Sequence, residues 1–62
     1  MLQAFLRVKD SAIEQALREI LIARVTCRAG QNASSLADAQ QLLAKAHDHA
    51  QAAVELLKVL RQ

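Results

Sequence analysis

The chain has 62 residues, a formal net charge of +2 and one cysteine. A domain of this length buries only about 60% of the surface that its unfolded chain exposes, so its own core gives marginal stability. The lone Cys27 excludes an internal disulfide, and association with other helices is the expected source of additional stability.

Alanine supplies much of the hydrophobic content, and the chain lacks Pro, Trp and Tyr. This composition favours helices, because strands draw on β-branched and aromatic residues. Turn-forming residues gather only between Gly30 and Ser35. The sequence therefore predicts an all-α fold, with residues 1–62 forming a single α-hairpin domain.

The first predicted helix has two candidate starts. Ser11 and Glu14 have the spacing of a capping box, which would place the start directly after Ser11. However, the apolar spacing that joins Leu6 to Ile13 continues upstream and favours a start near Gln3. We expect the longer helix, which runs through Ser11 without a break.

Gly30 is expected to end the first helix, because glycine readily takes the left-handed position that follows a helix. Arg28 would complement the negative end of the helix dipole. Ser35 then supplies an N-cap, with Asp38 near the positive end of the next dipole. The predicted elements are a helix over about residues 3–28, a turn over 29–34 and a helix over 35–61.

The second predicted helix carries a heptad repeat, in which apolar residues are spaced alternately by three and four. One series is mostly large and the other mostly alanine, and the first helix follows the same rule. A repeat of 3.5 residues keeps one stripe against a neighbouring helix, as in a coiled coil, so we predict an antiparallel hairpin. Its predicted core consists of Ile13, Ala16, Ile20, Ala23, Leu36, Ala39, Leu43, Ala46, Ala50, Ala53, Leu57 and Leu60.

Further apolar residues lie outside this predicted core. A two-helix hairpin has one internal interface, and large exposed apolar patches usually mark a binding surface. A second copy, forming a four-helix bundle, or the groove of a helical partner would cover them. The predicted partner interface consists of Leu17, Leu21, Val25, Leu42, Val54 and Leu56.

The chain offers little support for catalysis or metal binding. His47 and His49 are two residues apart, which places them on different faces of a helix, whereas metal ligands need a spacing of three or four. Cys27 falls in the large series of the first helix and is expected to act as a small core hydrophobe. We predict a protein that is not an enzyme and has no metal site, cofactor or small-molecule substrate.

Four basic residues suggest a different function for the first helix. An outer face carrying them could contact RNA phosphates, especially if dimerisation doubled it. Acidic residues are interspersed, so an ordinary solvated face is the competing interpretation. The candidate RNA-binding residues are Arg7, Lys9, Arg18 and Arg28.

Apolar segments are too short to cross a membrane, because Ile20 to Ala23 lies between Glu19 and Arg24 and a spanning helix needs about 18 apolar residues. The first residues also lack the order of a secretory signal. With an unpaired Cys27, a cytoplasmic protein that does not bind membranes is expected.

Two short segments of the second helix, Leu36-Ala37-Asp38-Ala39 and His47-Asp48-His49-Ala50, resemble the Rop family of plasmid copy-control proteins. The resemblance implies a homodimeric four-helix bundle whose first helices bind paired RNA loops. Arg28-Ala29-Gly30 and the alanine-rich second helix also look similar to the helical-hairpin co-chaperones of type III secretion. That likeness is architectural.

The first functional hypothesis is therefore a protein-interaction module that self-associates or binds a helical partner as an adaptor, chaperone-like subunit or inhibitor. The alternative is a Rop-like dimeric RNA-binding regulator that uses the basic residues of the first helix.

Overall fold

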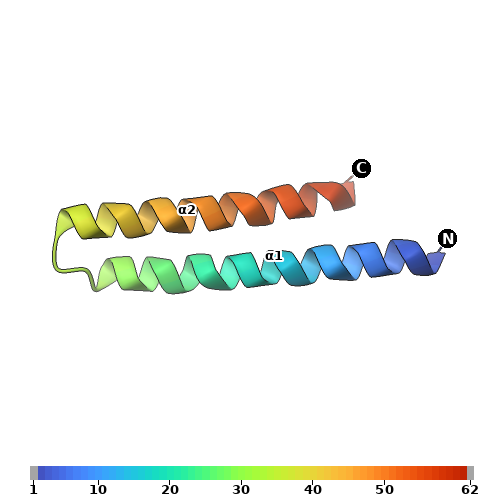
Figure 1. The fold of residues 1–62 in the computed structure, drawn as a ribbon, viewed down its shortest axis with the longest axis horizontal. Coiled ribbons are helices and arrows are strands. Elements are labelled where there is room, and N and C mark those ends of the chain that lie inside the picture. The colour runs from blue at the N-terminus through green and yellow to red at the C-terminus, as the bar shows by residue number, and fades with distance from the viewer. Residues whose placement is uncertain (1, 62) are drawn as a thin grey trace.

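The computed structural model describes residues 2–61 and contains two antiparallel helices joined by a short turn (Figure 1). Helix α1 spans Leu2–Gln31, helix α2 spans Leu36–Lys58, and a 3-10 turn, η1, follows over Val59–Arg61. The Cα atoms extend over 52 × 16 × 10 Å, so the molecule is a single layer of two helices. The predicted all-α helical hairpin is confirmed.

Helix α1 starts at Leu2, as the continuous apolar spacing predicted, and passes through Ser11 without a break. Ser11 does not cap a helix. Its hydroxyl oxygen instead accepts a hydrogen bond from Nε2 of Gln15 at 3.3 Å. The capping-box pattern is therefore overridden by the apolar residues upstream, which extend the amphipathic helix.

Helix α1 also ends later than expected. The prediction that Gly30 ends the helix in a left-handed conformation is wrong. Gly30 lies inside the helix, and no glycine in the described part of the chain has a positive φ. A Cβ atom at this position would lie 3.6 Å from Cδ2 of Leu43, so Gly30 sits where α1 and α2 approach closely. Packing against α2 accounts for the extra helical residues. The backbone N–H of Asn32 then closes the helix on the carbonyl oxygens of Arg28 and Ala29.

The start of α2 follows the sequence prediction. Ser35 has an extended backbone, and its hydroxyl oxygen accepts a hydrogen bond from the backbone N–H of Asp38 at 3.1 Å. This contact satisfies one of the backbone donors that the first turn of a helix leaves free. The cap fixes where the chain reverses.

The two helices meet along a narrow interface, which we call the seam. Its most buried members are Ala12, Ala16, Ala46 and Ala53, each at most 8% exposed. Residues seven apart form a row along such a helix pair, and alanine rows let the helices approach closely. The seam consists of the buried and half-buried positions in the two rows of each helix that face the other helix. They are Lys9, Ala12, Ala16, Glu19, Ala23, Thr26 and Gly30 of α1, Ala39, Leu42, Ala46, His49, Ala53 and Leu56 of α2, and Leu60 of η1.

Half of the predicted core residues, the alanine series and Leu60, lie in the seam. The large series lies outside it. The second row of the seam on each helix, which on α1 contains Ala12, Glu19 and Thr26, fills the remaining space between the helices instead. That row consists mostly of small or polar residues on α1, which permit the close approach. Ile13 is half-buried, and the predicted core residues that are exposed are Ile20, Leu36, Leu43, Ala50 and Leu57.

Helix α1 is longer than α2, with 30 residues against 23. Because Glu19 faces His49 in this antiparallel pair, the rise of both helices places Lys9 level with about Leu60. The first two turns of α1 therefore extend beyond the end of η1 (Figure 1). The overhang presents exposed Leu2 and Phe5.

Candidate interaction surface

A row of large residues flanks the seam on each helix, and we call the two rows together the apolar face. None of its eight side chains carries a charge. Several are widely exposed in the single chain, including Leu36 at 75%, Leu43 at 52% and Ile20 at 46%. The apolar face consists of Leu6, Ile13, Ile20 and Cys27 of α1 and Leu36, Leu43, Ala50 and Leu57 of α2.

Both rows of the apolar face lie on the same side of the hairpin. A surface hollow on this side is lined by Arg24, Cys27, Arg28 and Gln31 of α1 together with Leu43 of α2, so the Cys27 and Leu43 rows reach the same face. Gly30, a seam residue of α1, also lies close to the side chain of Leu43. In an antiparallel pair, rows displaced in the same sense on the two helices reach the same face. One side of the layer is therefore apolar across both helices.

The opposite side of the hairpin is mixed in character. There a second hollow lies between the helices and is lined by Val8 and Gln15 of α1 and Val59 of η1, among others. The rows that flank the seam on this side also include Asp38 and Lys45. The full rows are Val8, Gln15, Ile22 and Ala29 of α1, Asp38, Lys45 and Ala52 of α2, and Val59 of η1.

The predicted partner interface does not form one patch. Leu17 and Val54 border the apolar face, whereas Leu21 lies on the outer edge of α1 and Val25 on the mixed side, all four exposed. The remaining two predicted residues are half-buried in the seam. They are Leu42 and Leu56.

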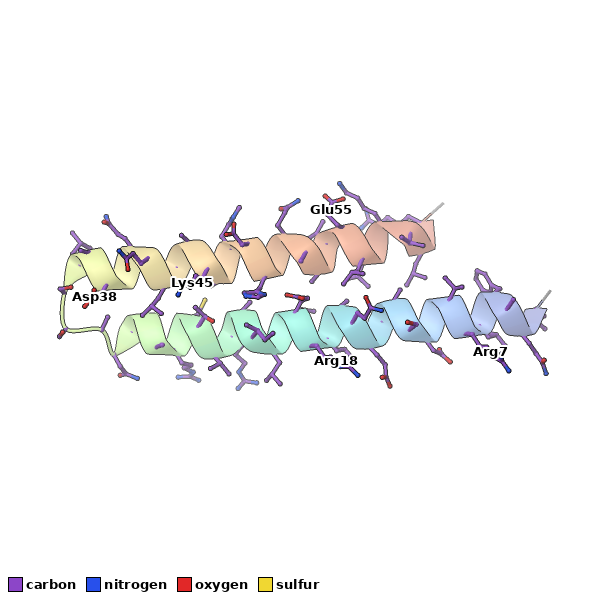
Figure 2. The ribbon with its side chains drawn as sticks, in the orientation of Figure 1. Arg7, Arg18, Asp38, Lys45 and Glu55 are labelled. Atoms are coloured by element: carbon purple, nitrogen blue, oxygen red, sulfur yellow. The ribbon has the colours of Figure 1, made fainter. Side chains whose placement is uncertain are left out.

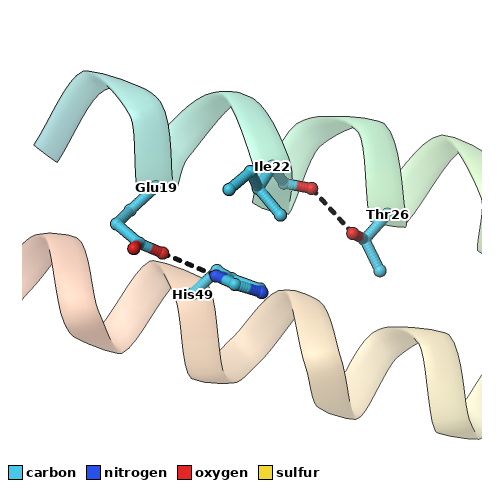
Figure 3. Close-up of polar contacts among 4 residues, drawn as sticks. All are labelled: Glu19, Ile22, Thr26 and His49. Atoms are coloured by element: carbon cyan, nitrogen blue, oxygen red, sulfur yellow. Dashed lines mark hydrogen bonds and ion pairs between the residues drawn. The ribbon is translucent and has the colours of Figure 1, made fainter. Parts of the chain in front are cut away.

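A polar pair crosses the middle of the seam. Nδ1 of His49 lies 2.5 Å from Oε2 of Glu19, and the two side chains are 38% and 29% exposed. Figure 3 shows the two side chains directed toward each other from α2 and α1. Thr26 lies two helical turns after Glu19 on α1. Its hydroxyl donates a hydrogen bond to the carbonyl oxygen of Ile22 at 2.7 Å (Figure 3).

The spacing of His47 and His49 predicts only that they lie on different faces of a helix, and the contact of His49 with Glu19 was not predicted. The available signal was the spacing of seven that joins Leu42, His49 and Leu56 in one row. His47 is exposed, with Nδ1 at 3.6 Å from Oδ1 of Asp48. Within residues 2–61, no group of three His, Cys, Asp or Glu side chains is placed to hold a metal ion.

The candidate RNA-binding residues are dispersed. Lys9 is half-buried at the seam, and Arg18 lies 3.9 Å from Glu14. Arg7 and Arg28 share the outer edge of α1 but are about 31 Å apart along the helix axis. Figure 2 shows Arg7 and Arg18 pointing away from α2. These four residues do not gather into one basic patch, and RNA binding stays a prediction.

Two further features complete the surface. Cys27 is a free, exposed thiol of the apolar face, so it is not a core residue of the hairpin itself. On the outer edge of α2, Nζ of Lys58 at 3.0 Å and Nε2 of Gln51 at 3.2 Å donate to Oε1 of Glu55. These contacts, led by Lys58, lower the pKa of the Glu55 carboxyl.

Comparison of the chain with protein-family models, with curated proteins and with solved structures found no match. The resemblance to the Rop family therefore stays a prediction. Neither helix of the described residues has both the length and the apolar character needed to cross a membrane.

Proposed function

We propose that this chain is a non-enzymatic protein-interaction module whose apolar face packs on the helices of a second copy and completes a four-helix bundle. The observation that carries the proposal is the apolar face itself, which continues over both helices on one side of the layer. A face of this kind on a small chain marks an interface with other helices.

The exposed area supports this proposal. The chain has an accessible surface of 5098 Å². A compact monomer with its mass of 6.8 kDa would expose about 3,950 Å² by the usual scaling of area with mass. The excess is about 1,150 Å² per chain, so two chains could bury about 2,300 Å². That area lies in the range of obligate homodimers.

The direction of the apolar rows also supports a bundle of four helices. With 3.5 residues per turn, the alanine row and the apolar row lie about 26° and about 77° from the line joining the helices. Their midpoint is about 51° away from that line. In a square four-helix bundle each helix directs its core residues about 45° from the line to either neighbour. Both helices of this hairpin thus aim toward the centre of such a bundle.

The test compares two aspartate substitutions on adjacent residues of α1. Ile20→Asp places a charge on the apolar face, whereas Leu21→Asp places the same charge on the outer edge, where the side chain is already 60% exposed. Sedimentation should give a monomer for Ile20→Asp and a dimer for Leu21→Asp. Equal masses for the two variants would contradict the proposal.

A further inference from the structure

We infer that the second copy packs on the apolar face in an antiparallel arrangement, in which α1 lies against α1 of the second copy and the two turns are at opposite ends. The inference rests on the proposed function and adds the orientation of the partner. Three features of α1 place a twofold axis at the same point along the helix to within half a residue.

The first feature is the length of α1. The helix runs from residue 2 to residue 31, so its midpoint lies between Ala16 and Leu17. A twofold axis through that point pairs α1 with its copy along its whole length. The overhanging first turns, with Leu2 and Phe5, then lie alongside the last turn and the connection of the second copy. The overhang thereby gains a partner that α2 does not supply.

The second feature is the apolar row of α1, which is symmetric about the same point. Leu6 and Cys27 are equally far from it, and so are Ile13 and Ile20. Under the twofold axis, Ile13 of one copy lies level with Ile20 of the other, and Leu6 with Cys27. Uncharged side chains of the apolar face therefore meet each other in all four layers of the α1 pair.

The third feature is charge. The row that borders the apolar face on α1 contains Gln3, Asp10, Leu17, Arg24 and Gln31. Its centre, Leu17, lies half a residue from the axis, so Asp10 of each copy lies within one residue of the level of Arg24 of the other. Neither side chain takes part in an ion pair within residues 2–61. The antiparallel arrangement gives each of them an oppositely charged partner, twice per dimer.

The alternative arrangement places both turns at the same end and packs α1 on α2 of the second copy. Both overhangs would then project from one end, leaving Leu2 and Phe5 without a neighbouring helix. The register of the seam would also place Arg24 near His47 and Asp10 near Arg61 of the second copy, so only Asp10 would gain an oppositely charged partner. The antiparallel arrangement avoids both problems.

The decisive experiment measures the distance between the two turns. Ser34, exposed in the turn, is changed to Cys and spin-labelled in a Cys27→Ala background, which keeps the apolar face apolar and is itself first checked to have the same mass as the unchanged chain. Pulsed dipolar spectroscopy on the dimer should give about 50 Å, from about 17 residues of helical rise on each side of the axis. A distance below about 20 Å in a dimer would overturn the antiparallel arrangement and leave the proposed function intact. A monomer with no dipolar signal would overturn both.

A charge exchange tests the pairing of Asp10 with Arg24. Asp10→Arg and Arg24→Asp should each raise the dimer dissociation constant by about tenfold, because each replaces two attractive pairs with two repulsive ones. The double variant should restore the dissociation constant to near that of the unchanged chain. If the double variant is weaker than either single variant, Asp10 does not face Arg24.

Discussion

Gly30→Ala should stabilise the hairpin. Gly30 is helical and is the last residue but one of α1, so the helix-interior preference for Ala over Gly, about 0.8–1.0 kcal/mol, is the upper bound of the gain. The added Cβ would meet Cδ2 of Leu43 at 3.6 Å, Cγ of Leu43 at 3.7 Å and the carbonyl oxygen of Ala39 at 3.9 Å, which are ordinary van der Waals distances. No packing cost offsets the gain in helix propensity. For a domain of this size, about 1 kcal/mol corresponds to a rise in Tm of about 4–8 °C.

The assay is thermal unfolding followed by circular dichroism, with all variants at one protein concentration because association shifts Tm. Ala29→Gly is the matched control. Ala29 is an exposed neighbour in the same turn of α1, and the substitution should lower stability by about 0.8–1.0 kcal/mol. A lower Tm for Gly30→Ala would refute the reasoning, since it would mean that Gly30 has a left-handed backbone that alanine resists.

Two further predictions concern polar contacts. Glu19→Ala and His49→Leu should each lower the free energy of unfolding by about 1 kcal/mol, whereas the double variant, which makes the seam apolar, should be at least as stable as the unchanged chain; additive losses in urea denaturation would contradict this coupling. The carboxyl of Glu55 should titrate below its ordinary pKa by NMR, and Lys58→Met should move it back up. Because the folded-state pKa is lowered, this contact stabilises the fold above the unfolded-state pKa, and the contribution is lost as the pH falls through the folded-state value; a Glu55 titration that Lys58→Met leaves unchanged would exclude the contact.

Local signals predicted the elements well. The cap at Ser35 and the position of the turn follow from short-range chemistry that the sequence contains in full. The helix end at Gly30 was predicted wrongly because the left-handed propensity of glycine is a local preference. Packing of this turn against Leu43 overrides that preference. Helix ends that touch another helix are determined by that contact as much as by their own residues.

The heptad repeat identified the alanine rows but not the direction of the large rows. On each helix the alanine row lies between two other rows. The repeat does not say which of these two rows packs against the other helix of the hairpin and which one stays exposed. The structure assigns the large row to the exposed side, as Ile20 and Leu43 illustrate. The contact of Glu19 with His49 joins residues 30 apart, so it depends on the register of the hairpin and has no short-range signature.

Burial of the apolar face by a second copy of the chain is tested by light scattering of the intact chain after size exclusion. We expect twice the chain mass of 6.8 kDa, about 13.6 kDa, at micromolar concentration. A mass of 6.8 kDa with a full helical circular dichroism spectrum, at every concentration up to the millimolar range, would contradict it.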